Sequence, residues 1–158
     1  MKAPKRPHVL YAEDNEDSCQ LMTVLLEMSG IDITCAQGSK NALLLANKER
    51  FDLFLLDLWL HDGDGNDLCV KLRNEFPHIP VVFYTGCATE AERKQGLRSG
   101  AHAYLLKPHS DLVAPTIMRL LGRNESAVET GTLEFLTQDA LRFVSIAPSA
   151  RWALPLSP

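Results

Sequence analysis

The sequence predicts an α/β fold, a doubly wound five-stranded parallel sheet flanked by five helices. Three observations lead to this prediction. Short apolar runs alternate with amphipathic stretches throughout residues 8–122. Two of the runs, 53–56 (LFLL) and 81–84 (VVFY), are continuously apolar, as expected of strands that are covered on both faces. Regular alternation of strands and helices implies right-handed crossovers and a parallel sheet.

Five short segments have the character of strands. The first, third and fourth are compact apolar runs, and the fifth is a short apolar segment. The second alternates apolar and polar residues, which is typical of an edge strand. In chain order the expected strands cover residues 8–12, 31–36, 53–56, 81–84 and 104–106. With the strand order 2-1-3-4-5, the first and third strands are neighbours.

Helical spacing of apolar residues fills the intervals between the strands. The first helix has an apolar face that ends before Gly30, and Gly100 and Gly122 follow two later helices, where glycine commonly ends a helix. Ser39 and Ser110 are the expected N-caps of the second and fifth helices. In chain order the expected helices lie around 21–28 and over 39–50, 66–74, 89–99 and 110–121.

The predicted domain covers residues 8–122, between a flexible N-terminus (1–7) and a tail (123–158) with one possible extra helix. The net charge of −4 and the pI near 5.7 do not favour direct nucleic-acid binding. No segment is long and apolar enough for membrane insertion. The four cysteines show no paired spacing, which indicates reduced thiols and a cytoplasmic location.

Chemically reactive side chains occur where four of the expected strands end. Each has a common structural explanation by itself, because Asp forms turns and acidic pairs begin helices. Their combination at four strand ends is much less expected by chance, and ligands of such sheets bind at this edge. In chain order these residues are Glu13 and Asp14, Asp57, Thr85 and Lys107.

The crowding of Glu13, Asp14 and Asp57 predicts a bound cation, because carboxylates that share a pocket repel each other. Hard oxygen ligands with few protein contacts suit Mg²⁺, or Mn²⁺. We expect Asp14 and Asp57 to be direct ligands, together with the backbone carbonyl of Trp59, and Glu13 to act through water. The metal would hold a phosphoryl oxygen in line with Asp57.

Asp57 is then the expected nucleophile, which forms an aspartyl phosphate. Thr85 can hydrogen-bond one phosphoryl oxygen, and Lys107 can pair with another. These three residues form the predicted catalytic group.

Residues 8 to about 121 resemble the receiver domain of two-component response regulators. The motifs that carry this resemblance are YAEDN at 11–15, LLDLWLHDGDG at 55–65, YTG at 84–86 and YLLKP at 104–108. The resemblance implies a flavodoxin-like receiver fold and a signalling phosphoprotein of a two-component phosphorelay. It also implies that no external substrate is turned over.

Individual roles are implied by the same resemblance. Thr85 matches the switch hydroxyl, and Tyr104 matches the aromatic switch that turns inward on activation. The Lys107–Pro108 bond matches a cis-peptide site, and cis bonds are affordable before proline.

The sequence departs from the usual pattern of the family at two positions. Glu13 replaces the commoner Asp, and His61 stands where the family often has Pro. We interpret His61 as a solvated loop residue, and we favour this over the alternative that it is a metal ligand. The resemblance also implies that Trp59, Gly86 and Cys87 occupy positions that, in this family, flank the site and tune the lifetime of the phosphorylated form.

The expected partners are a sensor histidine kinase or a His phosphotransfer protein, and then a downstream protein or a second copy. The downstream protein or second copy would bind the face formed by the fourth helix, fifth strand and fifth helix.

One alternative function is a pseudo-receiver, an interaction module that works without phosphorylation. A second is a Mg²⁺-dependent phosphohydrolase, although such enzymes usually carry a general-acid Asp at the position of Trp59. A third alternative is an FMN binder. Such a protein would need a phosphate-binding loop rich in Ser, Thr and Gly after the first strand, but acidic residues stand there in this sequence.

Overall fold

The computed structural model describes residues 2–123 and 143–147, and all structural statements below concern these residues. Its strands are β1 (His8–Ala12), β2 (Asp32–Ala36), β3 (Leu53–Leu56), β4 (Trp59–Leu60), β5 (Gly63–Asp64), β6 (Val81–Thr85), β7 (Ala103–Leu106) and β8 (Val144–Ile146). Its helices are α1 (Glu16–Met28), α2 (Ser39–Lys48), α3 (Gly65–Glu75), α4 (Glu90–Arg98), the 3₁₀ turn η1 (Ser110–Leu112) and α5 (Val113–Leu120).

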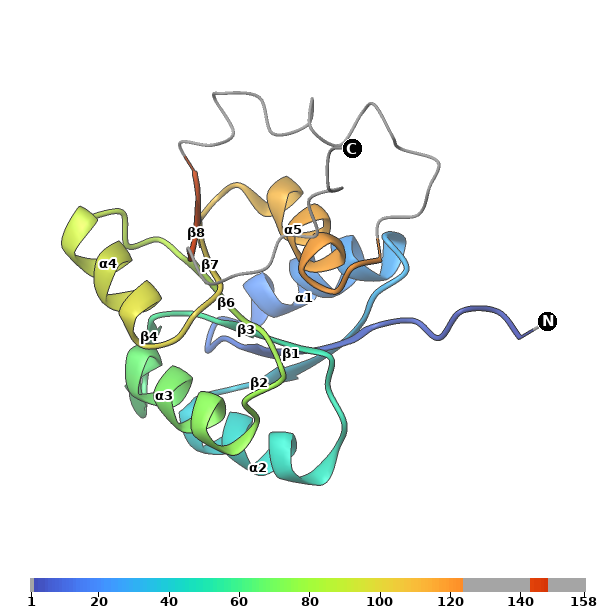
Figure 1. The fold of residues 1–158 in the computed structure, drawn as a ribbon, viewed down its shortest axis with the longest axis horizontal. Coiled ribbons are helices and arrows are strands. Elements are labelled where there is room, and N and C mark those ends of the chain that lie inside the picture. The colour runs from blue at the N-terminus through green and yellow to red at the C-terminus, as the bar shows by residue number, and fades with distance from the viewer. Residues whose placement is uncertain (1, 124–142, 148–158) are drawn as a thin grey trace, which may run out of the picture.

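The main sheet has six strands in the order β2-β1-β3-β6-β7-β8 (Figure 1). Neighbouring strands are parallel except for β8, which runs antiparallel to β7. The first five strands of this order are the five predicted from the sequence, so the predicted order 2-1-3-4-5 and the fold class are confirmed. The sequence did not predict β8 or the small β4–β5 hairpin.

The two faces of the sheet bury separate apolar clusters, which explains the continuous apolar run of β3. Leu53 and Leu55 face one cluster, together with side chains of α1 and α5, and Phe54 and Leu56 face the other, together with α2 and α3. All four side chains are fully buried. Successive residues of a strand point to opposite faces, so a strand covered on both sides needs an apolar residue at every position. Figure 1 shows helices on both sides of the sheet.

Side-chain caps begin three of the helices. Asn15 accepts a hydrogen bond from the Ser18 amide at the start of α1 (2.8 Å), and Asp64 accepts one from the Asn66 amide in α3 (2.7 Å). Thr89 forms a capping box at the start of α4. These bonds satisfy amides that have no partner within the helix, and they set the helix boundaries.

The two serine caps expected from the sequence are wrong. Gly38 is the N-cap of α2, and Ser39 is the first helical residue. The carboxylate of Asp62, distant in sequence, accepts hydrogen bonds from the amides of Ser39 (2.7 Å) and Lys40 (3.0 Å). Because these bonds satisfy the free amides, a local cap is not needed. Ser110 begins η1 instead of capping a helix.

The described part of the predicted tail is Arg123 and residues 143–147, and it contains β8. The extra helix suggested for this tail falls mainly on residues outside those described. None of the helices in the described ranges is both long and apolar enough to cross a membrane.

Candidate functional site

Four parallel strands bring the predicted reactive residues to one edge of the sheet. The backbone hydrogen bonding of the sheet continues for one residue beyond three of these strands. The backbone amides donate from Glu13 to the Ala36 carbonyl (3.0 Å), from Asp57 to the Ala12 carbonyl (3.0 Å) and from Lys107 to the Thr85 carbonyl (2.9 Å). These backbone bonds fix the starting point of each side chain. The carboxyl edge of a parallel sheet therefore carries two carboxylates, one hydroxyl and one ammonium group.

The ammonium group of Lys107 lies between two carboxylates. Its Nζ donates to Glu13 Oε2 (2.5 Å) and to Asp57 Oδ2 (3.1 Å). The two acids are almost buried, with 3% of Glu13 and 9% of Asp57 exposed. Burial by itself lowers the pKa of Lys107, but the hydrogen bond to Glu13 and the charges of both carboxylates outweigh it and raise the pKa overall. Lys107 is therefore charged at neutral pH and neutralises part of the acidic site.

Both oxygens of Glu13 have partners besides Lys107. The Tyr11 hydroxyl donates to Oε2 (3.0 Å), and the Asn15 amide donates to Oε1 (3.0 Å). Burial of the Tyr11 ring, and next the neighbouring Glu13 carboxylate, raise the pKa of Tyr11, so the phenol remains a donor. Glu13 is thus held rigidly at the end of β1.

The side chain of Asp14 is bound elsewhere. Its carboxylate accepts the backbone N–H of His61 (2.5 Å) and faces the His61 ring, with Oδ1 3.0 Å from Nδ1. The hydrogen bond to Asp14 and its charge raise the pKa of His61. Within the described ranges, no three His, Cys, Asp or Glu side chains are grouped closely enough to hold a metal. The structure therefore joins Glu13 and Asp57 through Lys107, and it places the Asp14 carboxylate against His61.

Thr85 is fully buried at the end of β6, and its hydroxyl accepts the Cys87 amide at 3.4 Å. The next residue, Gly86, is exposed, and a Cβ there would meet no atom within 4 Å. The space beside the Thr85 backbone is consequently open. The Lys107–Pro108 peptide bond, directly after the neighbouring strand β7, is cis, as the resemblance implied.

The ring of Tyr104 is buried, with 1% of the residue exposed, and its hydroxyl donates to the Cys87 carbonyl (2.8 Å). Burial is the main cause of its raised pKa. The ring lies against Phe83, with centroids 5.7 Å apart, and against α4 at Gly96. A Cβ on Gly96 would come within 2.8 Å of the ring, so the absence of a side chain makes room for it.

A side-chain contact joins the loops that follow β3 and β6. The indole N–H of Trp59 donates to Cys87 Sγ, while 62% of Trp59 is exposed. This contact holds the indole against the loop that follows β6.

Gly65, the last residue of the motif at 55–65, was not among the predicted site residues, but it is part of the site. A Cβ at this position would lie 2.4 Å from the carbonyl oxygen of Asp57 and 2.8 Å from Leu58 Cα. The Gly65 amide donates to the Leu58 carbonyl (2.7 Å), which brings α3 against the backbone that carries Asp57. The Gly in the Asp-Gly-Asp-Gly segment was the available signal, because close backbone approach requires glycine.

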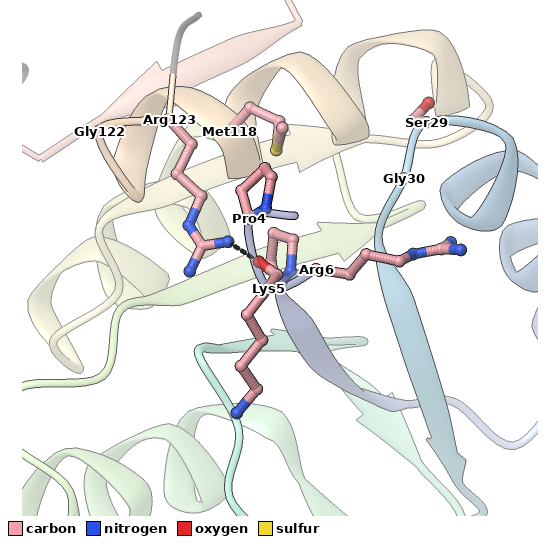
Figure 2. A pocket seen from close by; sticks show the side chains of 9 residues that line it. Pro4, Lys5, Arg6, Ser29, Gly30, Met118, Gly122 and Arg123 are labelled. Atoms are coloured by element: carbon pink, nitrogen blue, oxygen red, sulfur yellow. Dashed lines mark hydrogen bonds between the residues drawn. The ribbon is translucent and has the colours of Figure 1, made fainter. Parts of the chain in front are cut away.

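A separate cavity of about 590 Å³ lies beside the segment that precedes β1, next to the ends of α1 and α5 (Figure 2). Both arginine side chains that line it already have partners. Arg6 pairs with Asp32 (2.9 Å), and Arg123 donates to the Lys5 carbonyl, the bond drawn in Figure 2. None of the predicted site residues lines this cavity, so we assign it no part in the chemistry.

Residues 9–115 match the response regulator receiver domain. The chain is 32% identical over 127 residues to the alkaline phosphatase synthesis transcriptional regulatory protein PhoP of Bacillus subtilis, covering 80% of this chain and 53% of PhoP. It is 31% identical over 123 residues to the response regulator PleD of Caulobacter vibrioides, covering 77% of this chain and 27% of PleD. The chain thus spans about half or less of the length of these relatives.

Solved structures show the same similarity. The Francisella response regulator 1452 receiver domain superposes with a TM-score of 0.70 at 31% identity, covering 75% of this chain and 98% of that domain. A CheY-like receiver domain protein from Methanospirillum hungatei gives a TM-score of 0.70 at 25% identity, covering 74% and 94%.

Proposed function

The chain belongs to the response regulator receiver family, and from this premise we propose that Asp57 accepts a phosphoryl group from a phosphohistidine donor. The observation that carries the proposal is the position of the Lys107 ammonium group, 3.1 Å from Asp57 and 2.5 Å from Glu13 at the carboxyl edge of the sheet. A cation at this place can pair with phosphoryl oxygens as soon as they approach Asp57.

In the proposed reaction, a carboxylate oxygen of Asp57 attacks phosphorus. A P–O bond forms, the P–N bond to the donor imidazole breaks, and the imidazole leaves with the electron pair. Lys107 pairs with one phosphoryl oxygen, and the Thr85 hydroxyl donates to another. The buried position of Thr85 and the ladder bond between the backbones of Thr85 and Lys107 keep the two groups in register.

The carboxylates also suit Mg²⁺ or Mn²⁺. Glu13 and Asp57 share the single ammonium group of Lys107, Asp14 follows Glu13 directly in the chain, and the hard oxygen atoms of these carboxylates match such cations. We propose Asp14, Asp57 and the Trp59 carbonyl as ligands, with Glu13 acting through water. When bound, the cation offsets carboxylate charge and polarises the phosphoryl group.

Three residues are proposed to tune the lifetime of the phosphorylated form. Trp59 and Cys87 join the loops after β3 and β6 through their side-chain contact, and Gly86 leaves its side open. A bulky indole beside this opening can hinder the water molecule that hydrolyses the acyl phosphate. Thr85 and Tyr104 are proposed as the switch pair, since both approach Cys87.

Receiver domains are signalling domains, and we propose that this one turns over no external substrate. A phosphohydrolase would need a general acid two residues after Asp57, where Trp59 stands. The proposed donor is a sensor histidine kinase or a His phosphotransfer protein in the cytoplasm. A downstream protein or a second copy would then bind the α4–β7–α5 face, without direct contact to nucleic acid.

Incubation with acetyl phosphate and Mg²⁺, followed by intact-mass measurement, tests the proposal. We expect one phosphoryl group on the wild-type protein and none on Asp57→Asn. Omission of Mg²⁺ or the change Lys107→Ala should sharply reduce the yield. If the folded wild-type protein remains unmodified under all these conditions, the proposal is wrong and the protein acts as an interaction module that does not depend on phosphorylation. Continuous release of phosphate over many turnovers would instead indicate a phosphohydrolase.

A further inference from the structure

The outer edge of β7 is occupied by a segment of the same chain. In Figure 1, β8 lies beside β7 at the end of the sheet. The two strands pair antiparallel, with Leu105 opposite Val144 and Ala103 opposite Ile146. At the two ends, the Leu106 amide donates to the Phe143 carbonyl (3.2 Å) and the Ala147 amide donates to the His102 carbonyl (2.9 Å). The segment Phe143–Ala147 therefore satisfies backbone groups that an edge strand would otherwise expose.

This attachment is small and therefore reversible. β8 has only three residues, and its burial rests mainly on Val144 (6% exposed) and Ala147 (7% exposed). Short peripheral strands with few buried contacts belong to the part of a protein that opens most easily.

One end of the segment contacts both flanks of the phosphorylation site's lysine. The Phe143 carbonyl accepts the amide of Leu106, and the Phe143 ring stacks on His109, with centroids 3.7 Å apart and planes inclined by 25°. Between these contacts lie Lys107 and Pro108. The backbone that carries Lys107 is therefore held to Phe143 on both sides, and a change of this backbone on phosphorylation would disturb both contacts.

We propose that the β7 edge is a strand-binding surface, held closed by Phe143–Ala147 and opened by phosphorylation of Asp57 to an extended strand of a partner protein. This inference rests on the proposed function. An extended partner fits because the edge offers alternating backbone donors and acceptors, which a strand binds by sheet extension. By linkage, opening of the edge must favour phosphorylation to the same degree as phosphorylation favours opening.

Hydrogen–deuterium exchange of the full chain, with and without beryllofluoride and Mg²⁺, tests the coupling. We expect the amides of Leu106 and Ala147 to exchange at least about tenfold faster in the activated protein, because both depend on docked β8. Asp57→Asn should show no change. In parallel, acetyl phosphate labelling reports whether Asp57 is modified. An unmodified protein overturns the proposed function and this inference together. A modified protein with unchanged exchange at both amides overturns only the inference and makes β8 a permanent cover of the edge.

A variant pair tests the surface itself. Ser145 lies midway between the hydrogen-bonded pairs at Phe143 and Ala147, so its amide is expected to be a ladder donor. Ser145→Pro removes this donor, whereas Ser145→Ala retains it. We expect a synthetic peptide of residues 141–149 to bind full-length Ser145→Pro and the phosphorylated wild type, but neither Ser145→Ala nor the unphosphorylated wild type. Equal binding or no binding in all four samples would refute an edge that is opened by phosphorylation.

Discussion

Gly96→Ala should destabilise the protein, although alanine is the better helix former. In the interior of α4, the higher helix propensity of alanine should by itself stabilise the protein by about 1 kcal/mol. The new Cβ, however, would lie 2.8 and 2.9 Å from two carbons of the Tyr104 ring and 3.3 Å from Phe83. The ring is buried and anchored through its hydroxyl, so it cannot yield freely. Overpacking of this kind costs about 1–3 kcal/mol, and a net loss of about 1 kcal/mol follows.

A double-mutant cycle isolates the cause. In a Tyr104→Ala background the principal clash is gone, so Gly96→Ala should become stabilising by a few tenths to about 1 kcal/mol. Urea unfolding followed by far-ultraviolet circular dichroism measures all four proteins. The sign of the Gly96→Ala effect should reverse between the two backgrounds. If the substitution stabilises the wild type as much as it stabilises the Tyr104→Ala variant, the Tyr104 ring does not rest against α4 as described.

Asp62→Ala should cost about 1 kcal/mol at pH 7, because α2 loses its cap. Hydrogen bonds from the α2 amides lower the pKa of Asp62. The contribution of Asp62 to stability is therefore fully present above its ordinary pKa near 3.8 and declines as pH falls toward the lower folded value, so urea unfolding of both proteins should show a smaller difference at pH 3 than at pH 7. Lys107→Met should cost about 3 kcal/mol at pH 7 in the same urea unfolding measurement, because it leaves Glu13 and Asp57 without their shared cation. Trp59→Ala should shorten the lifetime of the phosphorylated protein, followed by intact mass after removal of the phosphodonor; an unchanged decay would contradict shielding by the indole.

The sequence was sufficient for the strand order and for the residues at the strand ends. Apolar runs such as 53–56 identify buried strands locally, and parallel pairing then brings their carboxyl ends together without further information. The contact of Lys107 with Glu13 and Asp57 is a direct consequence of this topology. Its detailed form, with one ammonium group between two nearly buried acids, was not predicted.

Other features depend on contacts between distant segments, which periodicity does not encode. The cap of α2 comes from Asp62 and not from the adjacent Ser39, and Asp14 faces His61 across 47 positions of sequence. Nothing in the local sequence explains a glycine within α4. The explanation is the Tyr104 ring, which occupies the space that a side chain at Gly96 would need. Strand β8 is too short to give an alternating pattern, and its partner strand lies far earlier in the chain.

The hydrogen bonds of the β4–β5 hairpin make His61 a competitor of any cation that uses Asp14. A metal ion that binds these Asp14 oxygens would compete with both contacts to His61, while Asp62 keeps the hairpin attached to α2. For a cation that binds only molecules with released Asp14, the apparent affinity would be the intrinsic affinity multiplied by the released fraction, so a released fraction of one tenth would weaken binding about tenfold. A metal ion at the proposed site would therefore also shift the hairpin away from the position that it has in this structure.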